Sequence, residues 1–142
     1  MNVLHYTLYL PQRTIDVLHK HAEESLPSES VGLMFGKITG SDVYVKRMEL
    51  LDNTAESSRT SFAVDPEIQY RLYVEAEERG ESLVCIFHSH PAPPFPSSSD
   101  IRNMNLNSVV WLIASKKSGT WTSKAFILSD GAPNEVTIVE DF

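Results

Sequence analysis

The order of apolar and polar residues along the chain predicts a protein in which strands and helices alternate. Short apolar runs and apolar–polar alternation are typical of strands. They predict strands at residues 4–10, 31–36, 43–50, 83–88, 109–115, 123–128 and 136–139. Polar segments that contain glycine separate several of these strands and predict turns, at residues 39–42, 117–119 and 130–131. The pattern therefore predicts a mixed sheet with helices packed on it.

Three further segments are predicted to be helices, at residues 11–27, 65–80 and 98–107. The second helix has the clearest boundaries. Asp65 can cap its first turn, Pro66 suits its first position, and Gly80 suits its end. The polar residues 52–61 before this helix predict a loop.

Several aromatic residues lie in or near the predicted elements. Phe62, Tyr70 and Tyr73 are predicted to pack in the core or at its edge. Trp111 lies in an apolar strand and is also predicted to be a core residue. Trp121 follows a turn, and its position leaves core and surface both open.

Length and composition are those of an ordinary globular domain. With 142 residues, 42% of them hydrophobic, the chain is long enough for one domain over residues 1–142 with a buried core. No apolar run approaches the roughly 18 residues of a membrane span, and residues 1–6 lack the features of a signal peptide. The single cysteine, Cys85, excludes an intrachain disulfide and favours a reducing cytoplasm.

The charge of the chain bears on its partners. The formal net charge is −7, from 12 Lys and Arg against 19 Asp and Glu, and there is no basic run. Nucleic-acid binding is therefore disfavoured as the main activity, because it requires positive charge against the phosphates. A basic or neutral partner is mildly favoured.

Two histidines follow the apolar strand predicted before residue 88. A strand places residues i and i+2 on one face, so His88 and His90 should leave the strand end side by side, about 7 Å apart. Asp100 follows after a proline-rich loop. Two imidazoles and a carboxylate are ligands that zinc takes, and three protein ligands leave a fourth position for water. That arrangement is typical of a catalytic zinc site, and Cys85 lies on the opposite face of the strand as a predicted core residue.

Each of these signals has a structural alternative. His19 and His21 form a second His-x-His pair, but in a helix they point about 200° apart, so they cannot share a metal and should be solvated. The segment from Ser97 to Asp100 has the form of a helix capping box. The proline segment 91–96 could bind an adaptor domain, although between a strand and a helix it is more simply a stiff turn.

A second motif favours the catalytic interpretation. The segment P-x-E-x-V-G-L-x-x-G from Pro27 to Gly36 places Glu29 at the start of an apolar strand that ends in glycine. Together with the downstream segments H-S-H-P and P-S-x-x-D, at 88–91 and 96–100, it resembles the JAMM (MPN+) metalloprotease family. The two motifs occur in the family's order, and the resemblance extends from about Thr7 to the end of the chain.

The spacing of the metal-ligand motif has one departure from the family and excludes two other families. The JAMM family usually has ten residues between the second histidine and the aspartate, whereas residues 91–99 make nine here. A metallo-β-lactamase requires an acid two residues after the second histidine, where Ala92 stands. An amidohydrolase barrel requires a much longer chain.

The resemblance implies a fold and a site. The implied fold is an α/β fold of the α+β type, with a mixed sheet. It is the MPN/JAMM fold, a cytidine-deaminase-like layered sheet with flanking helices. One Zn²⁺ is held by three ligands, His88, His90 and Asp100. Glu29 is the general base, and Ser97 donates a hydrogen bond to the oxyanion. Phe95, in the loop over the metal, is a candidate substrate contact.

The resemblance also implies an activity: hydrolysis of the bond after the C-terminal Gly-Gly of a ubiquitin-like or sulfur-carrier protein, as in a prokaryotic-type desampylase. The alternative is a non-catalytic MPN scaffold that has lost the metal, which the intact motif residues disfavour. A DNA-associated relative is disfavoured by the charge. The partner is then the tail of such a carrier protein, with no nucleic acid and no membrane, and the chain could form a homodimer.

Overall fold

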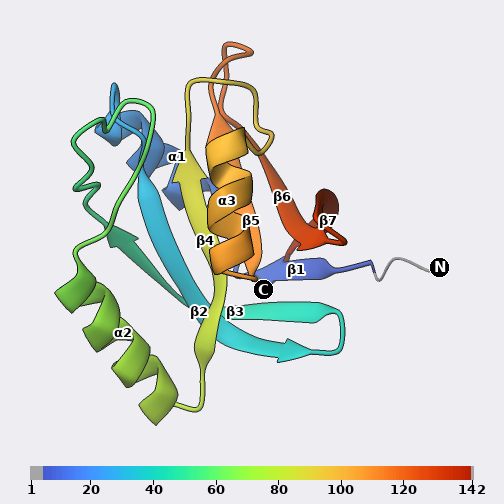
Figure 1. Ribbon diagram of the computed structural model, residues 1–142. Coiled ribbons are helices and arrows are strands. Elements are labelled where there is room, and N and C mark those ends of the chain that lie inside the picture. The colour runs from blue at the N-terminus through green and yellow to red at the C-terminus, as the bar shows by residue number, and fades with distance from the viewer. Residues whose placement is uncertain (1–4, 142) are drawn as a thin grey trace.

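A computed structural model describes residues 5–141, in which seven strands form one mixed sheet (Figure 1). The strands are β1 (Thr7–Leu10), β2 (Val31–Thr39), β3 (Asp42–Leu51), β4 (Ser82–Ser89), β5 (Val110–Ser115), β6 (Thr122–Ser129) and β7 (Ala132–Glu140). Their order across the sheet is β1-β3-β2-β4-β5-β6-β7. Because β1 pairs in parallel with both β3 and β7, the sheet closes into a barrel.

Helices cover both faces of this sheet, and they are α1 (Thr14–Ser25), α2 (Pro66–Glu78) and α3 (Ser98–Leu106). Leu18 of α1 belongs to the same core as Cys85 of β4. Met104 of α3 belongs to a second core, which includes residues of α2 and Ile86 of β4. From Cys85 onward, successive residues of β4 alternate between the two cores, and His88 lies on the face that α2 and α3 cover.

The fold class predicted from the sequence is confirmed, since a mixed sheet carries three helices in the described part of the chain. Each predicted strand and helix is present, with boundaries that differ by a few residues. Leu4, the predicted start of the first strand, lies outside the described residues. The capping role of Asp65 is confirmed by the hydrogen bond that its side chain accepts from the Glu67 N–H. Closure of the barrel was not predicted, because it depends on β1 pairing with strands distant in sequence.

The predicted solvation of the first histidine pair is wrong. His19 and His21 are both only partly exposed. The ring of His19 stacks on Trp121 with centroids 6.1 Å apart, and its Nε2 lies 2.7 Å from the Ser123 hydroxyl. Ser123 of β6 and Trp121, just before that strand, thus cover this side of α1. The helical pattern of the sequence alone could not predict these contacts.

The other buried and aromatic residues mostly follow the predictions. Cys85 and Trp111 are buried, and burial raises the pKa of the Cys85 thiol far above its usual range. Phe62 and Tyr73 are half-buried. Tyr70 is an exception, because its side chain is 72% exposed on the outer side of α2. The prediction that it packs in or beside the core is wrong.

The packing of the sheet explains Gly36, the last glycine of the motif from Pro27 to Gly36. The register of β2 shifts between Phe35 and Gly36, where the strand passes close to β3. A Cβ atom at Gly36 would clash with the backbone carbonyl of Tyr44. Gly36 therefore serves the sheet rather than the chemistry.

Candidate active site

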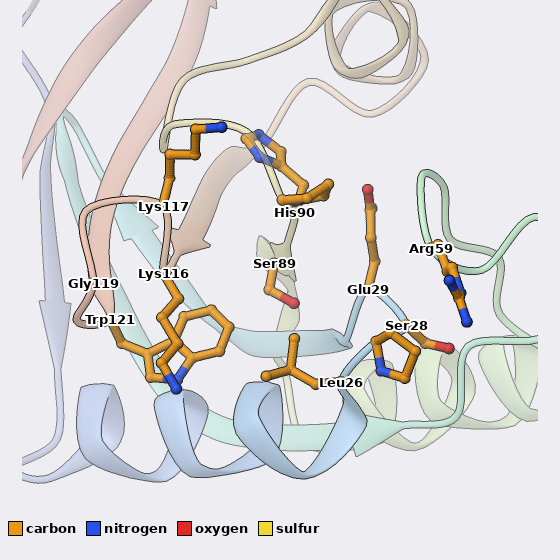
Figure 2. A pocket seen from close by; sticks show the side chains of 12 residues that line it. Leu26, Ser28, Glu29, Arg59, Ser89, His90, Lys116, Lys117, Gly119 and Trp121 are labelled. Carbon is orange, nitrogen blue, oxygen red and sulfur yellow. The ribbon is translucent and has the colours of Figure 1, made fainter.

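The pairing of β2 with β4 brings the two sequence motifs together. The strands are antiparallel, with Val31 opposite His88, so Glu29 lies just before β2 at the end of β4. Figure 2 shows Glu29 and His90 extending into the same cavity. The Glu29 carboxylate is only 5% exposed, and its Oε1 lies 3.4 Å from Nδ1 of His88. A carboxylate this deeply buried beside an imidazole is a candidate general base.

Two serines hold these strand ends in place. The Ser89 hydroxyl accepts a hydrogen bond from the Ser30 N–H at 2.9 Å and lies 2.7 Å from the Ser30 hydroxyl. The Ser89 N–H in turn donates to the Ser30 carbonyl at 3.2 Å. Since Ser30 follows Glu29 and Ser89 separates the two histidines, this contact fixes the base relative to both imidazoles.

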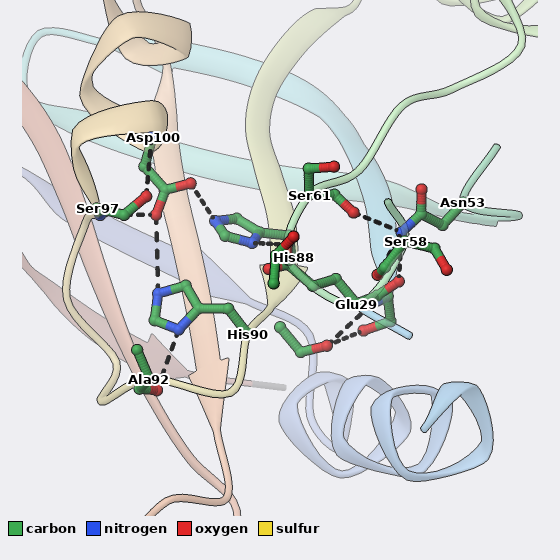
Figure 3. Close-up of polar contacts among 12 residues, drawn as sticks. Glu29, Asn53, Ser58, Ser61, His88, His90, Ala92, Ser97 and Asp100 are labelled. Carbon is green, nitrogen blue, oxygen red and sulfur yellow. Dashed lines mark hydrogen bonds and ion pairs between the residues drawn. The ribbon is translucent and has the colours of Figure 1, made fainter. Parts of the chain in front are cut away.

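The capping box and the metal-ligand motif use the same atoms. The Ser97 N–H donates to Oδ2 of Asp100 at 2.9 Å, and the Asp100 N–H donates to the Ser97 hydroxyl at 3.1 Å (Figure 3). The other carboxylate oxygen, Oδ1, lies 3.1 Å from Nε2 of His88. The predicted capping box is confirmed, and it also orients the Asp100 carboxylate toward His88.

His90 is fixed by backbone contacts. Its N–H donates to the Ala114 carbonyl of β5 at 3.0 Å. The ring Nδ1 lies 3.0 Å from the carbonyl of Ala92, and Nε2 lies 3.0 Å from the carbonyl of Phe95 and 3.7 Å from Oδ2 of Asp100. The proline loop thus wraps around this imidazole and brings Asp100 back to it.

The electrostatics of the cluster favour a charged imidazole beside charged carboxylates. Burial alone would lower the pKa of His88, but the neighbouring Asp100 and Glu29 outweigh it and raise this pKa to about 9. Burial also opposes ionisation of Asp100, yet the contact with His88 dominates and the pKa of Asp100 is lowered. His88 therefore has an acidic side chain at each of its two ring nitrogens, and both favour its charged form.

The donor set fits zinc in its chemistry. Both ring nitrogens of His88 are buried, and the carboxylates of Asp100 and Glu29 lie 3.1 and 3.4 Å from them without hydrogen-bond geometry, so a metal ligand would satisfy these polar atoms better. His88, His90 and Asp100 supply the nitrogen and oxygen donors that zinc prefers. Among residues 5–141, no three such side chains are arranged to hold a metal as they stand. Instead, the carboxylate of Asp100 lies directly against the two imidazoles.

Asn53, in the loop before α2, is a residue that the sequence analysis missed. Its side-chain N–H groups donate to the carbonyls of Glu29 and Ser61 at 2.9 Å and of Ser58 at 3.3 Å. Its carbonyl oxygen accepts two backbone N–H groups of the same loop. The Glu29 N–H also donates to Ser58, at 2.6 Å. The loop is therefore tied to the candidate base through one amide, a role that asparagine in a polar loop commonly takes.

Phe62 covers the imidazole of His88. The two rings stack with centroids 5.0 Å apart, and Phe62 also lies 5.9 Å from the Trp111 ring. The sequence predicted Phe62 only as a packing residue. Its position shields His88 from solvent and so strengthens the electrostatic contacts of the cluster.

Two cavities meet at Glu29, His90 and Pro91. The basic cavity, of about 300 Å³, is also lined by Arg59, Lys116, Lys117 and Trp121. The loop cavity, of about 230 Å³, is also lined by Phe62, Ser97, Asp100 and Asn103.

The structure therefore brings together five of the six residues predicted for the site: Glu29, His88, His90, Ser97 and Asp100. The backbone carbonyl of Phe95 contacts His90, but the side chain of Phe95 lies apart from these five residues. Its side chain is 52% exposed, packs against Phe126 and lines neither cavity. Its role as a substrate contact stays a prediction, as does the binding of zinc.

Comparison with known proteins defines the class of protein to which this arrangement belongs. Residues 11–126 match the family described as prokaryotic homologs of the JAB domain. The match spans most of the chain, from the start of α1 into β6, and includes both motifs. The chain belongs to this family, and the JAMM-type assignment made from its sequence is confirmed.

Individual relatives are similar over nearly the whole chain. A desampylase of Pyrococcus furiosus is 36% identical over 135 residues, covering 94% of this chain and 90% of the relative. A Thermus thermophilus protein named as a probable TtuB-protein conjugate cleaving protease is 32% identical over 133 residues, covering 93% of this chain and 82% of the relative. The solution structure of a Desulfitobacterium hafniense protein superposes with a TM-score of 0.80 at 29% identity, covering 95% and 93% of the two chains.

Proposed function

We propose that this protein is a zinc-dependent peptidase that hydrolyses the peptide or isopeptide bond after the C-terminal Gly-Gly of a ubiquitin-like or sulfur-carrier protein. The observation that carries the proposal is the buried cluster of Glu29 with His88, His90 and Asp100, which opens to two cavities. The names of the Pyrococcus and Thermus relatives support the same class of substrate. We place the enzyme in the cytoplasm, in keeping with its single, buried cysteine.

Three side chains hold the metal in this proposal. His88, His90 and Asp100 are its ligands, and one Zn²⁺ is bound per chain. When bound, zinc lowers the pKa of water and polarises a carbonyl group. The ligands need a deprotonated His88, and because the pKa of this residue is raised to about 9 without metal, binding releases a proton near neutral pH.

Glu29 moves the protons of the reaction. Its carboxylate takes a proton from the attacking water, whose oxygen forms a bond to the scissile carbonyl carbon. The carbon–nitrogen bond then breaks, and the proton held by Glu29 passes to the leaving nitrogen. The products are the Gly-Gly carboxylate and a free amine. Burial of Glu29 at 5% exposure keeps bulk water from competing for this proton.

Ser97 stabilises the negative charge on the carbonyl oxygen. Its hydroxyl oxygen already accepts the Asp100 N–H, so its own proton is available to donate. Ser97 lines the loop cavity with Glu29, which allows one carbonyl group to lie between them. The capping role therefore positions the donor rather than competing with it.

The tail of the substrate fits this site better than a folded surface. A flexible Gly-Gly segment can approach the backbone closely, because glycine has no Cβ. The proline loop of residues 91–96 forms one wall, and in this proposal Phe95 at its outer side contacts the carrier protein. A general peptidase or an amidase for small molecules needs no such tail.

The test is cleavage of a host ubiquitin-like protein fused through Gly-Gly to a second protein, with products identified by intact mass. We expect cleavage after the second glycine, loss of cleavage with a zinc chelator, and a sharply reduced kcat/KM when Ala-Ala replaces Gly-Gly. Equal cleavage of both fusions would contradict the assigned substrate class. A purified protein that holds zinc but cleaves neither fusion would favour the scaffold alternative.

A further inference from the structure

A third cavity adjoins the loop cavity and takes no part in the site described above. We call it the α2–α3 cavity, because both helices contribute to its lining, and its volume is about 150 Å³. It shares Phe62 and Asn103 with the loop cavity, and it shares no lining residue with the basic cavity. The α2–α3 cavity therefore lies beside the loop cavity, with Phe62 and Asn103 at the boundary.

The lining of the α2–α3 cavity is uncharged, unlike that of the other two cavities. Five of its residues are apolar, and three carry a side-chain amide. They are Leu33, Phe62, Val64, Ile86 and Trp111, and Gln69, Asn103 and Asn107. An apolar cavity of about 150 Å³ binds a molecule the size of benzene, and an amide can both donate to and accept from a peptide group. The cavity therefore suits one uncharged side chain of a peptide, with the peptide backbone beside it.

Asn103 carries an amide that is available to a ligand. Among residues 5–141, its side chain forms no hydrogen bond, although its backbone carbonyl accepts from the Asn107 N–H at 2.9 Å. The other two amides each donate to a neighbour, Gln69 to the Tyr73 hydroxyl at 2.8 Å and Asn107 to the Asn103 carbonyl at 3.4 Å. Asn103 is half-buried where the two cavities adjoin. A peptide that passes from one cavity to the other can therefore satisfy this amide.

The spacing along α3 relates Asn103 to the proposed oxyanion donor. Ser97, Asp100 and Asn103 follow one another at intervals of three residues, and all three line the loop cavity. From Ser97 to Asn103 the helix rises by about 9 Å, whereas an extended peptide advances by about 3.3 Å per residue. A tail that has its scissile carbonyl at Ser97 and runs along α3 therefore reaches Asn103 about three residues earlier, just before Gly-Gly.

We propose that the α2–α3 cavity binds an apolar side chain of the carrier-protein tail, one or two residues before Gly-Gly, and that the Asn103 amide binds the tail backbone beside it. This inference rests on the proposed function. The two glycines then lie in the loop cavity, and the chain before them passes Phe62 and Asn103. Because no charged group lines the α2–α3 cavity, an aspartate there would lose its hydration without gaining a partner.

The experiment compares substrates that differ at single positions of the tail. The host ubiquitin-like protein is fused through Gly-Gly to a second protein. Each of the two residues before Gly-Gly is replaced in turn by leucine, phenylalanine or aspartate, while the other is kept as alanine. The full-length, zinc-loaded enzyme cleaves each fusion, and kcat/KM is measured by mass spectrometry. We expect leucine to be preferred over aspartate at one of the two positions by about tenfold or more.

Variants of the cavity should change its preference in opposite directions. Val64→Ala enlarges the cavity and should raise the phenylalanine-to-leucine ratio of kcat/KM by about threefold to tenfold, whereas Val64→Leu narrows the cavity and should lower this ratio. Asn103→Ala should raise KM by about fivefold while kcat changes by less than about twofold. Asn105→Ala removes the same amide from an exposed position of α3, so it should leave both parameters unchanged.

A cross-linking measurement tests the position of the tail without turnover. A photoreactive diazirine leucine is placed at the preferred position of the tail, and the substrate is bound to zinc-loaded Glu29→Gln. It should attach to residues that line the α2–α3 cavity, such as Val64 and Asn103. Cross-links confined to the basic cavity would overturn the inference, because the tail would then lie on the other side of Glu29.

Two kinetic results would also overturn the inference and leave the proposed function intact. One is equal kcat/KM for leucine and aspartate at both positions, with cleavage after Gly-Gly unchanged. The other is a leucine preference that neither Val64 variant alters, because the side chain would then bind elsewhere. Failure to cleave any of the Gly-Gly fusions would instead remove the proposed function itself.

Discussion

The basic cavity and the loop cavity share three lining residues but differ in nearly everything else. The basic cavity is built from the end of α1, the loop between β5 and β6, and the side chain of Arg59. The loop cavity is built from the start of α3 and the loop before α2, and its charged lining groups are the acids Glu29 and Asp100. Glu29 and His90 lie where the two meet.

This difference places the proposed catalytic groups on one side of Glu29 and the Lys and Arg side chains on the other. The loop cavity contains Ser97, the oxyanion donor of the proposed mechanism, and the capping box that orients Asp100. The basic cavity offers cations and apolar contacts but no acid besides Glu29. Substitutions on the two sides should therefore change different kinetic parameters.

The largest effect on kcat is expected from Glu29→Gln, because Glu29 lines both cavities and is the proposed general base. Glutamine is nearly isosteric but cannot accept the proton of water, so kcat should fall by about 10²–10⁴-fold while zinc content and thermal stability are kept. Glu24→Gln, on the exposed side of α1, is the matched control and should behave as wild type. A Glu29→Gln enzyme within about threefold of wild type would exclude Glu29 as the base.

Ser97→Ala should affect the loop-cavity side alone. Loss of the oxyanion donor should lower kcat by about 10²-fold, and loss of the helix cap should lower the free energy of unfolding by about 1 kcal/mol. Ser97→Thr keeps both the cap and the donor and should restore most of each. Ser98→Ala, one residue into α3, is the control. A stability loss without a rate loss would mean that Ser97 is a cap only.

Asn53→Ala should loosen the wall that the loop cavity shares with Glu29. The backbone groups that this amide satisfies become unpaired, so we expect a loss of about 2–3 kcal/mol in the free energy of unfolding and about a tenfold lower kcat. Asn53→Asp keeps the accepting oxygen and removes the donors to Glu29, so its effect on kcat should exceed its effect on KM. Asn105→Ala, whose amide contacts only its own helix, is the control.

Without metal, the contacts of His88 with Asp100 and Glu29 should make the stability of the folded protein depend on pH. The pKa of His88 is raised from 6.5 to about 9, so the contribution of its charged form is fully present below pH 6.5 and lost as the pH rises through about 9. The lowered pKa of Asp100 acts at the other end, and its contribution is lost only in acid. The melting temperature in chelator should therefore fall by a few degrees between pH 6.5 and pH 9. A melting temperature that stays constant or rises over this interval would contradict the assigned contacts of His88.

Local sequence patterns predicted the elements and most of the site. His88, His90 and Asp100 lie within one short segment, and Glu29 was identified because the segment from Pro27 to Gly36 resembles a motif of the JAMM family. The contacts that hold these residues depend on pairings distant in sequence, such as Ser30 with Ser89 and Asn53 with Glu29.

Sequence patterns also failed to predict the basic cavity and the partial burial of the histidines of α1. Arg59, Lys117 and Trp121 come from separate loops, and no spacing in the sequence indicates that they line one cavity. His19 has the exposed-face position of an ordinary helix residue, yet Ser123 of β6 contacts it. Such neighbours come from elements that are distant in the sequence and meet only in the folded chain.

The central claim is that His88, His90 and Asp100 hold the zinc that Glu29 uses, and the most direct measurement is the zinc content of purified variants by elemental analysis. We predict one equivalent in the wild-type protein and in Glu29→Gln, and well below one in His90→Ala, with circular dichroism showing that all three remain folded. A full equivalent of zinc in folded His90→Ala would contradict the ligand assignment, and a wild-type protein that takes up no zinc would contradict the account as a whole.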